Sequence, residues 1–187
     1  MPAVWQVDVC RRAELSATEI AEQAELGRRS WAASSEPDAR YPFGIVWTPP
    51  TWLALVREPG GRLIGRAGVL ERTVLWGGVP TPVGGVSSVS TDPDFRGQGV
   101  ASAAVSSLAD FLCSELGATA GLLLASRMGA PLYKRLGWQE VSGPLQCEQP
   151  QGTLLWTSTF PDKPALVWMC TANPLPAGAI DLQGLPW

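Results

Sequence analysis

The segment DPDFRGQGVASAAV, residues 92–105, carries residue types whose spacing could do chemistry. Arg96 is followed by Gly97 and Gly99 and then by an apolar run that predicts a helix. Glycine is a poor helix former, but it tolerates unusual dihedral angles and leaves room for a bulky ligand. The first amides of a helix lack intrahelical partners and carry the positive end of its dipole. The segment therefore predicts a binding site for an anion such as a diphosphate, with a plain tight turn as the alternative.

Two other glycine-rich phosphate sites fit this segment less well. The stretch GQGVAS lacks the third glycine or alanine of G-x-G-x-x-G, and it lies in the middle of the chain. No acidic residue stands in a predicted strand about twenty residues further on, where a ribose ligand is expected. A P-loop is excluded because no G-K-[ST] occurs. A dinucleotide-dependent oxidoreductase is therefore only a minor alternative.

The composition narrows the chemistry further. The chain of 187 residues has no histidine, which excludes Ser-His-Asp and Cys-His catalysis and most zinc sites, so no metal is expected. A net charge of −3 argues against a nucleic-acid partner. No apolar run approaches the length of a membrane span, and we expect a cytoplasmic protein. The four cysteines form no CxxC and are expected to be free thiols: Cys10, Cys113, Cys147 and Cys170.

Hydrophobic periodicity predicts the elements that must position this segment. Strands are predicted at 4–10, 51–58, 62–76, 83–91, 120–126, 138–143 and 165–170, and helices after the capping box Ser16–Glu19, over 99–116 and over 130–137. The fully apolar run 120–126 is expected to be a central strand. Residues 32–50 and 144–164 are expected to be long loops, the first either gripping a substrate or packing on the surface. The order of elements predicts one α+β domain over residues 1–187.

Two blocks of the sequence resemble the GNAT superfamily of acyl-CoA-dependent N-acetyltransferases. The family signature [QR]-x-x-G-x-[GA] matches residues 96–101 at each fixed position. Further on, PLYKRLGW resembles the family block LYEKLGF, with Tyr133, Gly137 and Trp138 at matching places. The resemblance covers about residues 60–140. It implies a mixed, mostly antiparallel sheet of six to seven strands, splayed at its centre and with helices on both faces.

The resemblance also implies a site for acetyl-CoA between the strand before the signature and the next central strand. The residues implied to bind this coenzyme are Val89, Ser90, Thr91, Arg96, Gly97, Gln98, Gly99, Val100, Ala101 and Ser126. An amide of the first three would hold the thioester oxygen as negative charge develops. Tyr133 matches the family tyrosine that protonates the departing thiolate. Ser126 stands where many members have asparagine, and its shorter hydroxyl would reach a pantetheine amide.

The group that takes a proton from the attacking amine is left open by the sequence. The candidates are Glu71, Asp181, ordered water and the terminal carboxylate of Trp187. The last is suggested by the C-terminal half, which is similar to the aminoglycoside 2'-N-acetyltransferases. Those enzymes end in an acidic residue, a few further residues and a terminal tryptophan, and their tail contacts substrate amines. The alternative is a tail that only packs on the domain. Those enzymes place a glutamate nine residues before the signature arginine, whereas this chain has Ser87. A less acidic acceptor cleft is therefore expected, and some of the nine tryptophans could line it for a hydrophobic amine.

These features predict transfer of an acetyl group from acetyl-CoA to a primary amine of a small-molecule acceptor. The alternative is a non-catalytic module that binds or senses acyl-CoA on the same fold. Such a module would keep the diphosphate site but would not need Tyr133. A homodimer is a further expectation, because the sheet should have exposed strand edges and because members of the resembled family form pairs of subunits.

Overall fold

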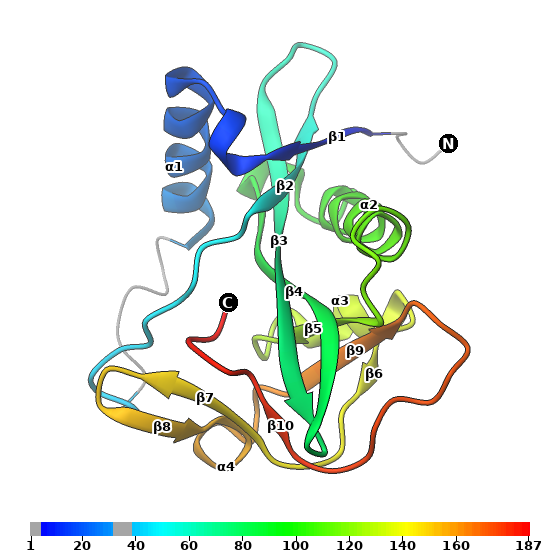
Figure 1. Ribbon diagram of the computed structural model, residues 1–187. Helices are drawn as coiled ribbons and strands as arrows, with labels where there is room; N and C mark the ends of the chain where they lie inside the picture. Colours follow the sequence, from blue (N-terminus) through cyan, green and yellow to red (C-terminus); the bar gives the residue numbers. More distant parts are fainter. Residues whose placement is uncertain (1–4, 32–38) are drawn as a thin grey trace.

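The computed structural model describes residues 5–31 and 39–187, so the start of the first predicted strand and part of the loop predicted at 32–50 lie outside the described residues. The described residues form one mostly antiparallel, curled sheet of ten strands (Figure 1). The strands are β1 Gln6–Arg11, β2 Trp52–Arg57, β3 Leu63–Trp76, β4 Val79–Thr91, β5 Ala120–Leu124, β6 Gln139–Glu140, β7 Leu145–Gln149, β8 Gly152–Leu155, β9 Ala165–Met169 and β10 Ile180–Asp181. The helices are α1 Ala17–Trp31, α2 Val100–Ser114, α3 Ala130–Arg135 and α4 Trp156–Thr159, with 3-10 turns η1 Arg12–Glu14 and η2 Pro93–Phe95.

The predicted fold class is confirmed, and the sheet has more strands than the six to seven expected. Its order is β6-β9-β5-β4-β3-β10-β7-β8, and β2 pairs with both β1 and β3. The long hairpin of β3 and β4 forms the middle of the molecule (Figure 1). The apolar strand β5 lies between β4 and β9, which confirms its predicted central place.

Helices pack on both faces of the central hairpin. Consecutive side chains of a strand point to opposite faces, and the neighbours Gly65 and Arg66 in β3 show this directly. A Cβ atom at Gly65 would come within 2.2 Å of Val100 in α2. The Arg66 guanidinium instead donates to the Gln23 side chain of α1, with 3.1 Å between Nη1 and Oε1. Figure 1 accordingly shows α1 and α2 on opposite sides of β3 and β4.

The loop predicted at 144–164 was wrong, because it contains strands β7 and β8 and the short helix α4. In β7 the buried residues Leu145, Cys147 and Gln149 alternate with more exposed ones, as in a strand. Because the third buried residue, Gln149, is polar, the sequence shows no alternation of apolar and polar residues there. The tail, in which no strand was predicted, contributes the short strand β10 between β3 and β7. These additions account for most of the extra strands.

Strand β4 begins four residues earlier than predicted, at Val79, although Pro80 and Pro82 follow. The first pairing of β4 with β5 is at Val83. Before Val83, β4 has no strand of the described chain on the side where β5 pairs later, and proline is tolerated at such an edge. The turn of the hairpin is instead Gly77 and Gly78, both with positive φ.

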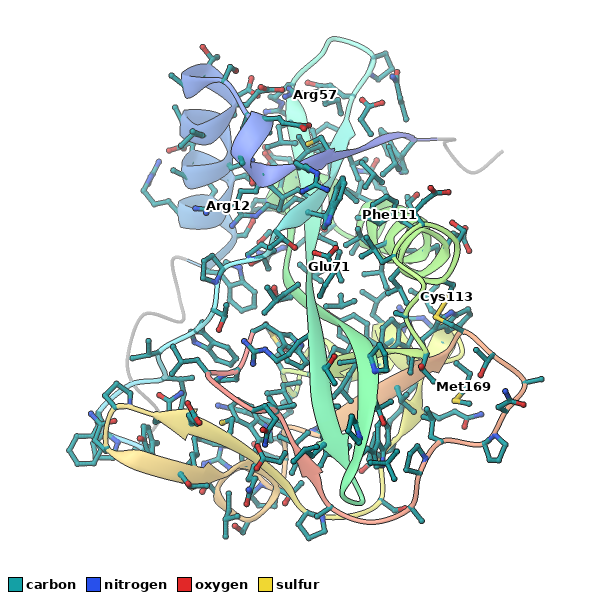
Figure 2. All side chains as sticks on the ribbon, in the orientation of Figure 1. Arg12, Arg57, Glu71, Phe111, Cys113 and Met169 are labelled. Atoms are coloured by element: carbon teal, nitrogen blue, oxygen red, sulfur yellow. A yellow bond between two sulfur atoms is a disulfide. The ribbon has the colours of Figure 1, made fainter. Side chains whose placement is uncertain are left out.

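The expectation of four free thiols was wrong for two of the cysteines. Cys113 near the end of α2 and Cys170 just after β9 form a disulfide, with their Cα atoms 5.1 Å apart (Figure 2). The two residues are 57 positions apart in sequence. The amide of Cys170 donates to the carbonyl of Thr119, in the segment between α2 and β5, which places Cys170 near the end of α2. Cys10 and Cys147 are free, as predicted.

Candidate functional site

The two glycines of the signature form an open, positively polarised turn at the start of α2. Gly97 has φ +77° and Gly99 has φ +85°, a region that favours glycine over other residues. A Cβ atom at either position would meet nothing within 4 Å, so the turn faces open space. Across the described residues, neither amide donates to a backbone or side-chain group. The first amides of α2 also lack intrahelical partners, and together these donors suit an anion.

A buried carboxylate connects this turn to α1. Asp92 is 1% exposed, and its Oδ1 accepts a hydrogen bond of 3.0 Å from the amide of Asp94 at the start of η2. Its Oδ2 lies 2.6 Å from Nη1 of Arg29 in the last turn of α1. The Arg96 side chain donates to the carbonyl of Ser30. The C-terminal end of α1 and the glycine turn are therefore fixed to each other.

Strands β4 and β5 separate just before the turn. Their parallel pairing runs from Val83–Ala120 to Val86–Leu123. Beyond Val86, β4 continues to Thr91 paired with β3, and on its β5 side no strand of the described chain pairs with it. Backbone groups of β4 are thus left without a sheet partner at this edge, as a ligand that pairs like a strand would need.

A β-bulge lies at this separation. Ser88 and Val89 of β4 stand opposite the single residue Ala67 of β3, and Ser88 has φ +55°. Bulges are frequent next to active sites, where they redirect side chains and end pairing. Here the bulge comes just after the last residue of β4 that pairs with β5.

The separated strands open into a cleft of 1630 Å³, and one of its lining residues, Arg12, is labelled in Figure 2. Eleven of the predicted site residues line it: Val89, Ser90, Thr91, Arg96, Gly97, Gly99, Val100, Ala101, Ser126, Tyr133 and Trp187. The structure therefore brings the signature, the strand before it and the tyrosine block to one cavity.

Tyr133 of α3 is 8% exposed and lines the cleft. Its ring packs edge-on against Trp138, with 6.1 Å between the centroids. Burial raises the pKa of the Tyr133 phenol to about 12, because the phenolate would lose its hydration. The phenol therefore stays protonated at neutral pH and can donate a proton.

Ser126 lines the same cleft, but its hydroxyl already has a structural partner. Oγ accepts a hydrogen bond of 3.0 Å from the amide of Gly129, and the carbonyl of Ser126 accepts from Gly129 and Ala130. These bonds fix the entry into α3, and with it the position of Tyr133. A hydroxyl that already accepts one bond can still donate one to a ligand.

Trp187 closes the cleft at the last paired residues of β4 and β5. Its indole is 3% exposed, and Nε1 donates to the carbonyl of Leu122 over 3.1 Å. The Arg72 guanidinium lies 5.1 Å from the ring centroid and donates to the carbonyls of Leu182 and Leu185. Desolvation lowers the pKa of Arg72, which still leaves it a cation at neutral pH.

Three predicted site residues do not line the cleft: Glu71, Asp181 and Gln98. Glu71 on β3 accepts a hydrogen bond of 2.9 Å from Thr51 (Figure 2). Desolvation raises the pKa of Asp181, but hydrogen bonds from Gln183 and Gln146 outweigh it, so the net pKa is lowered and the carboxylate is a poorer base. The Gln98 carbonyl accepts from the indole of Trp5.

Three polar atoms of lining residues are buried and have no hydrogen-bond partner among the described residues: Oγ of Ser87, Oγ1 of Thr91 and Nε of Arg66. Sequence reasoning named Ser87 and Thr91 but missed Arg66. Sequence reasoning also missed Gly85, where the Trp187 ring comes close. Two adjacent glycines inside a predicted strand, as at 84–85, are a signal for such a close approach.

The described residues offer neither a metal site nor a membrane-spanning helix. Between residues 5–31 and 39–187, no group of three or more His, Cys, Asp and Glu side chains could hold a metal ion. Within the same part of the chain, no helix is long and apolar enough to cross a membrane.

Comparisons with known proteins agree on one family. A family model described as "Acetyltransferase (GNAT) domain" matches residues 12–141. A curated aminoglycoside 2'-N-acetyltransferase of Mycolicibacterium fortuitum is 34% identical over 94 residues. That match covers 49% of this chain, and the chain spans only 46% of the relative's length.

Solved structures share the fold at low sequence identity. A GNAT family N-acetyltransferase of Escherichia coli in complex with CoA has a TM-score of 0.63 and 18% identity, over 100% of this chain and 97% of that one. A GNAT family acetyltransferase of Brucella melitensis in complex with acetyl-CoA has a TM-score of 0.57 and 15% identity, over 94% of each chain.

Proposed function

The chain belongs to the acetyltransferase (GNAT) family, and from that premise we propose that it moves an acetyl group from acetyl-CoA directly to a primary amine of a small-molecule acceptor. One observation carries the proposal: the unpaired edge of β4, the open glycine turn and the buried phenol of Tyr133 line a single cleft. The named relatives support it, because one is an aminoglycoside N-acetyltransferase and two are solved with CoA or acetyl-CoA.

Each part of acetyl-CoA has a matching part of the cleft. The diphosphate would rest on the amides of Gly97, Gly99 and the first turn of α2, where a Cβ atom would find open space. The amides of pantetheine would pair with the β4 edge at Val89–Thr91. Ser126 would offer its hydroxyl to a pantetheine amide. Gln98 would contribute through its backbone, because its side chain donates to the carbonyl of Asp94.

In the proposed transfer, the amine nitrogen attacks the thioester carbon and forms the new C–N bond as the C–S bond breaks. An amide at the end of β4 would stabilise the charge that develops on the thioester oxygen, a contribution of about 3 kcal/mol in comparable sites. Tyr133 would give its proton to the departing thiolate. The proton of the amine would go to the carboxylate of Trp187 or to ordered water, since Glu71 and Asp181 do not line the cleft.

The experiment is a titration of acetyl-CoA by calorimetry, followed by an assay of thiol release with a panel of amines. We expect binding and amine-dependent release of CoA, with a matching acetylated product by mass. Binding without any transfer would favour the alternative, a non-catalytic acyl-CoA-binding or sensing module. No binding of acetyl-CoA, with binding of NAD(P)H instead, would favour an oxidoreductase.

The single domain over 1–187, the homodimer and the cytoplasmic location stay predictions. The Cys113–Cys170 disulfide bears on the location, because disulfides are rare in reducing compartments.

A further inference from the structure

The part of the cleft built by the segment 41–50 and by α4 is lined with aromatic rings. We call this surface the aromatic wall; it consists of Tyr41, Trp47, Trp156 and Phe160. Three of the rings form a chain of contacts, with centroids 5.7 Å apart for Trp47–Trp156 and 4.7 Å apart for Trp156–Phe160. None of these residues belongs to the glycine turn, β4 or β5, so the wall is separate from the surfaces proposed for acetyl-CoA.

Trp47 is the exposed member of the wall, on a fixed backbone. Its side chain is 47% exposed, whereas Trp156 and Phe160 are buried. On one side, the amide of Val46 donates to Oε1 of Gln149 over 2.9 Å, and Nε2 of Gln149 donates to the carbonyl of Val46. On the other side, the amide of Thr48 donates to the carbonyl of Pro186. An apolar ring held in this way is already ordered, so a ligand that packs on it loses little entropy.

The charged side chains that line the cleft have one sign. Six cationic side chains line it: Arg12, Arg66, Arg96, Arg127, Arg135 and Lys163. In the part of the chain that the structure describes, the lining includes no aspartate or glutamate. A cleft lined by one sign of charge repels ligands of the same sign. An acceptor with several ammonium groups would find no side-chain carboxylate to pair with here.

Two rings of the cleft already have a cation beside them. Nζ of Lys163 lies 4.5 Å from the centroid of Phe160, and the Arg72 guanidinium lies 5.1 Å from that of Trp187. A second cation over either ring would be repelled by the first. In the aromatic wall, the ring of Phe160 is thus already occupied by a cation, and the exposed ring of Trp47 offers a surface on which a flat ring can pack.

We propose that the acceptor is a small aromatic monoamine: a primary amine attached to a flat ring and carrying no second positive charge. Its ring packs on Trp47 in the aromatic wall, and its amine is acetylated. This inference rests on the proposed function and names the class of its acceptor. It separates this chain from polycationic acceptors, although one relative is an aminoglycoside acetyltransferase.

The test compares kcat/KM for matched amines with the full chain and acetyl-CoA. The panel contains 2-phenylethylamine, tyramine and tryptamine as aromatic monoamines, 2-cyclohexylethylamine as their saturated counterpart, and spermidine and kanamycin as polycations. We expect the aromatic monoamines to exceed the saturated amine by up to about tenfold, the scale of a ring–ring contact. We expect them to exceed both polycations by a larger factor.

Variants of the segment 41–50 locate the effect. Trp47→Ala is expected to lower kcat/KM for tryptamine about 30-fold, the scale of losing a central aromatic contact. Trp47→Phe, which keeps a ring, should restore most of that loss. Phe43→Ala is the matched control, because Phe43 is 69% exposed in the same segment but does not line the cleft.

The outcomes distinguish failure of the inference from failure of the proposed function. Faster acetylation of spermidine or kanamycin than of the aromatic amines overturns the inference and leaves the proposed function intact. Equal effects of Trp47→Ala and Phe43→Ala also overturn it. If no amine is acetylated, the proposed function fails, and calorimetry of tryptamine against the CoA-loaded protein decides the inference alone. Binding that is lost in Trp47→Ala then supports it, and the absence of heat overturns it.

Discussion

The indole of Trp187 lies directly against Gly85, so that a Cβ atom at Gly85 would come within 2.2 Å of two ring atoms. The pair sits where β4 and β5 begin to separate, and Nε1 of the same ring donates to Leu122 of β5. The ring thus packs on the Gly85–Leu122 pair, one pair before the two strands separate. This contact joins a glycine and a tryptophan that are far apart in sequence.

Gly85→Ala is expected to displace the Trp187 ring and to lower the free energy of unfolding by about 1–3 kcal/mol, as overpacking does. Chemical denaturation measures this. The matched control is the same change in a Trp187→Ala background, where the clash is gone. We expect Gly85→Ala to have little further effect there, and an equal effect in both backgrounds would contradict the contact.

One alanine added after Trp187 is expected to lower kcat about 100-fold and to change its pH dependence, because it moves the carboxylate proposed as base and leaves the indole in place. Steady-state kinetics across pH measures this. Unfolding of the extended chain by denaturant serves as the control and should be unchanged. Unaltered turnover with an unaltered pH profile would leave ordered water as the base.

Tyr133→Phe is expected to lower kcat by a factor of about 100 while acetyl-CoA binding stays unchanged, because the variant loses only the proton donor. The pH profile gives a second check. The acid form is the active one, and burial raises the pKa of Tyr133 to about 12. Loss of activity by ionisation of this phenol should therefore begin only well above pH 10, so kcat is expected to show no fall between pH 8 and pH 10. A fall with a midpoint near pH 10 would point to an unperturbed group.

Gly99→Ala is expected to weaken acetyl-CoA binding through its backbone, since alanine at φ +85° is strained by about 1–2 kcal/mol. Gly61→Ala is a close control: Gly61 has φ +89° in the β2–β3 hairpin, and both positions offer a Cβ atom open space. Both variants should lose similar stability in denaturation. Only Gly99→Ala should raise the Kd for acetyl-CoA in calorimetry, and equal Kd values would remove the diphosphate from this turn.

Cys113→Ser is expected to lower the free energy of unfolding by about 4 kcal/mol, because the disulfide closes a segment of 57 residues. Denaturation with and without a reductant measures this. Reductant should destabilise the parent chain and leave Cys113→Ser unaffected. Cys10→Ser removes a free thiol and should respond to reductant as the parent does.

The parts of the fold that the sequence predicted are those with strong local signals. Helix α2 follows from an apolar repeat, and α1 follows from its capping box, in which the Ser16 amide donates to Glu19 over 2.9 Å and Oγ of Ser16 accepts from the Glu19 amide. The apolar run of β5 predicted its central place in the sheet. Short strands such as β10 were missed, because two residues have no periodicity and form a strand only through their neighbours.

The part of the site proposed for acetyl-CoA was predictable, because the turn, the strand edge and the tyrosine block each have a recognisable pattern in the local sequence. The base candidates were less so. Glu71 and Asp181 are carboxylates in plausible places along the chain, but the pleat and partners of β3 and β10 direct them elsewhere. The aromatic wall combines the segment 41–50 with α4, and no pattern in either stretch indicates that they meet.

The Asp92 carboxylate has a wider consequence. One oxygen orders the start of the turn proposed for the coenzyme, and the other holds Arg29 at the end of the helix that brings Trp31 to the cleft. A change in α1 that moves Arg29 is therefore expected to disturb this turn as well. A laboratory programme that remodels the amine pocket through α1 would therefore have to reselect coenzyme affinity in the same round.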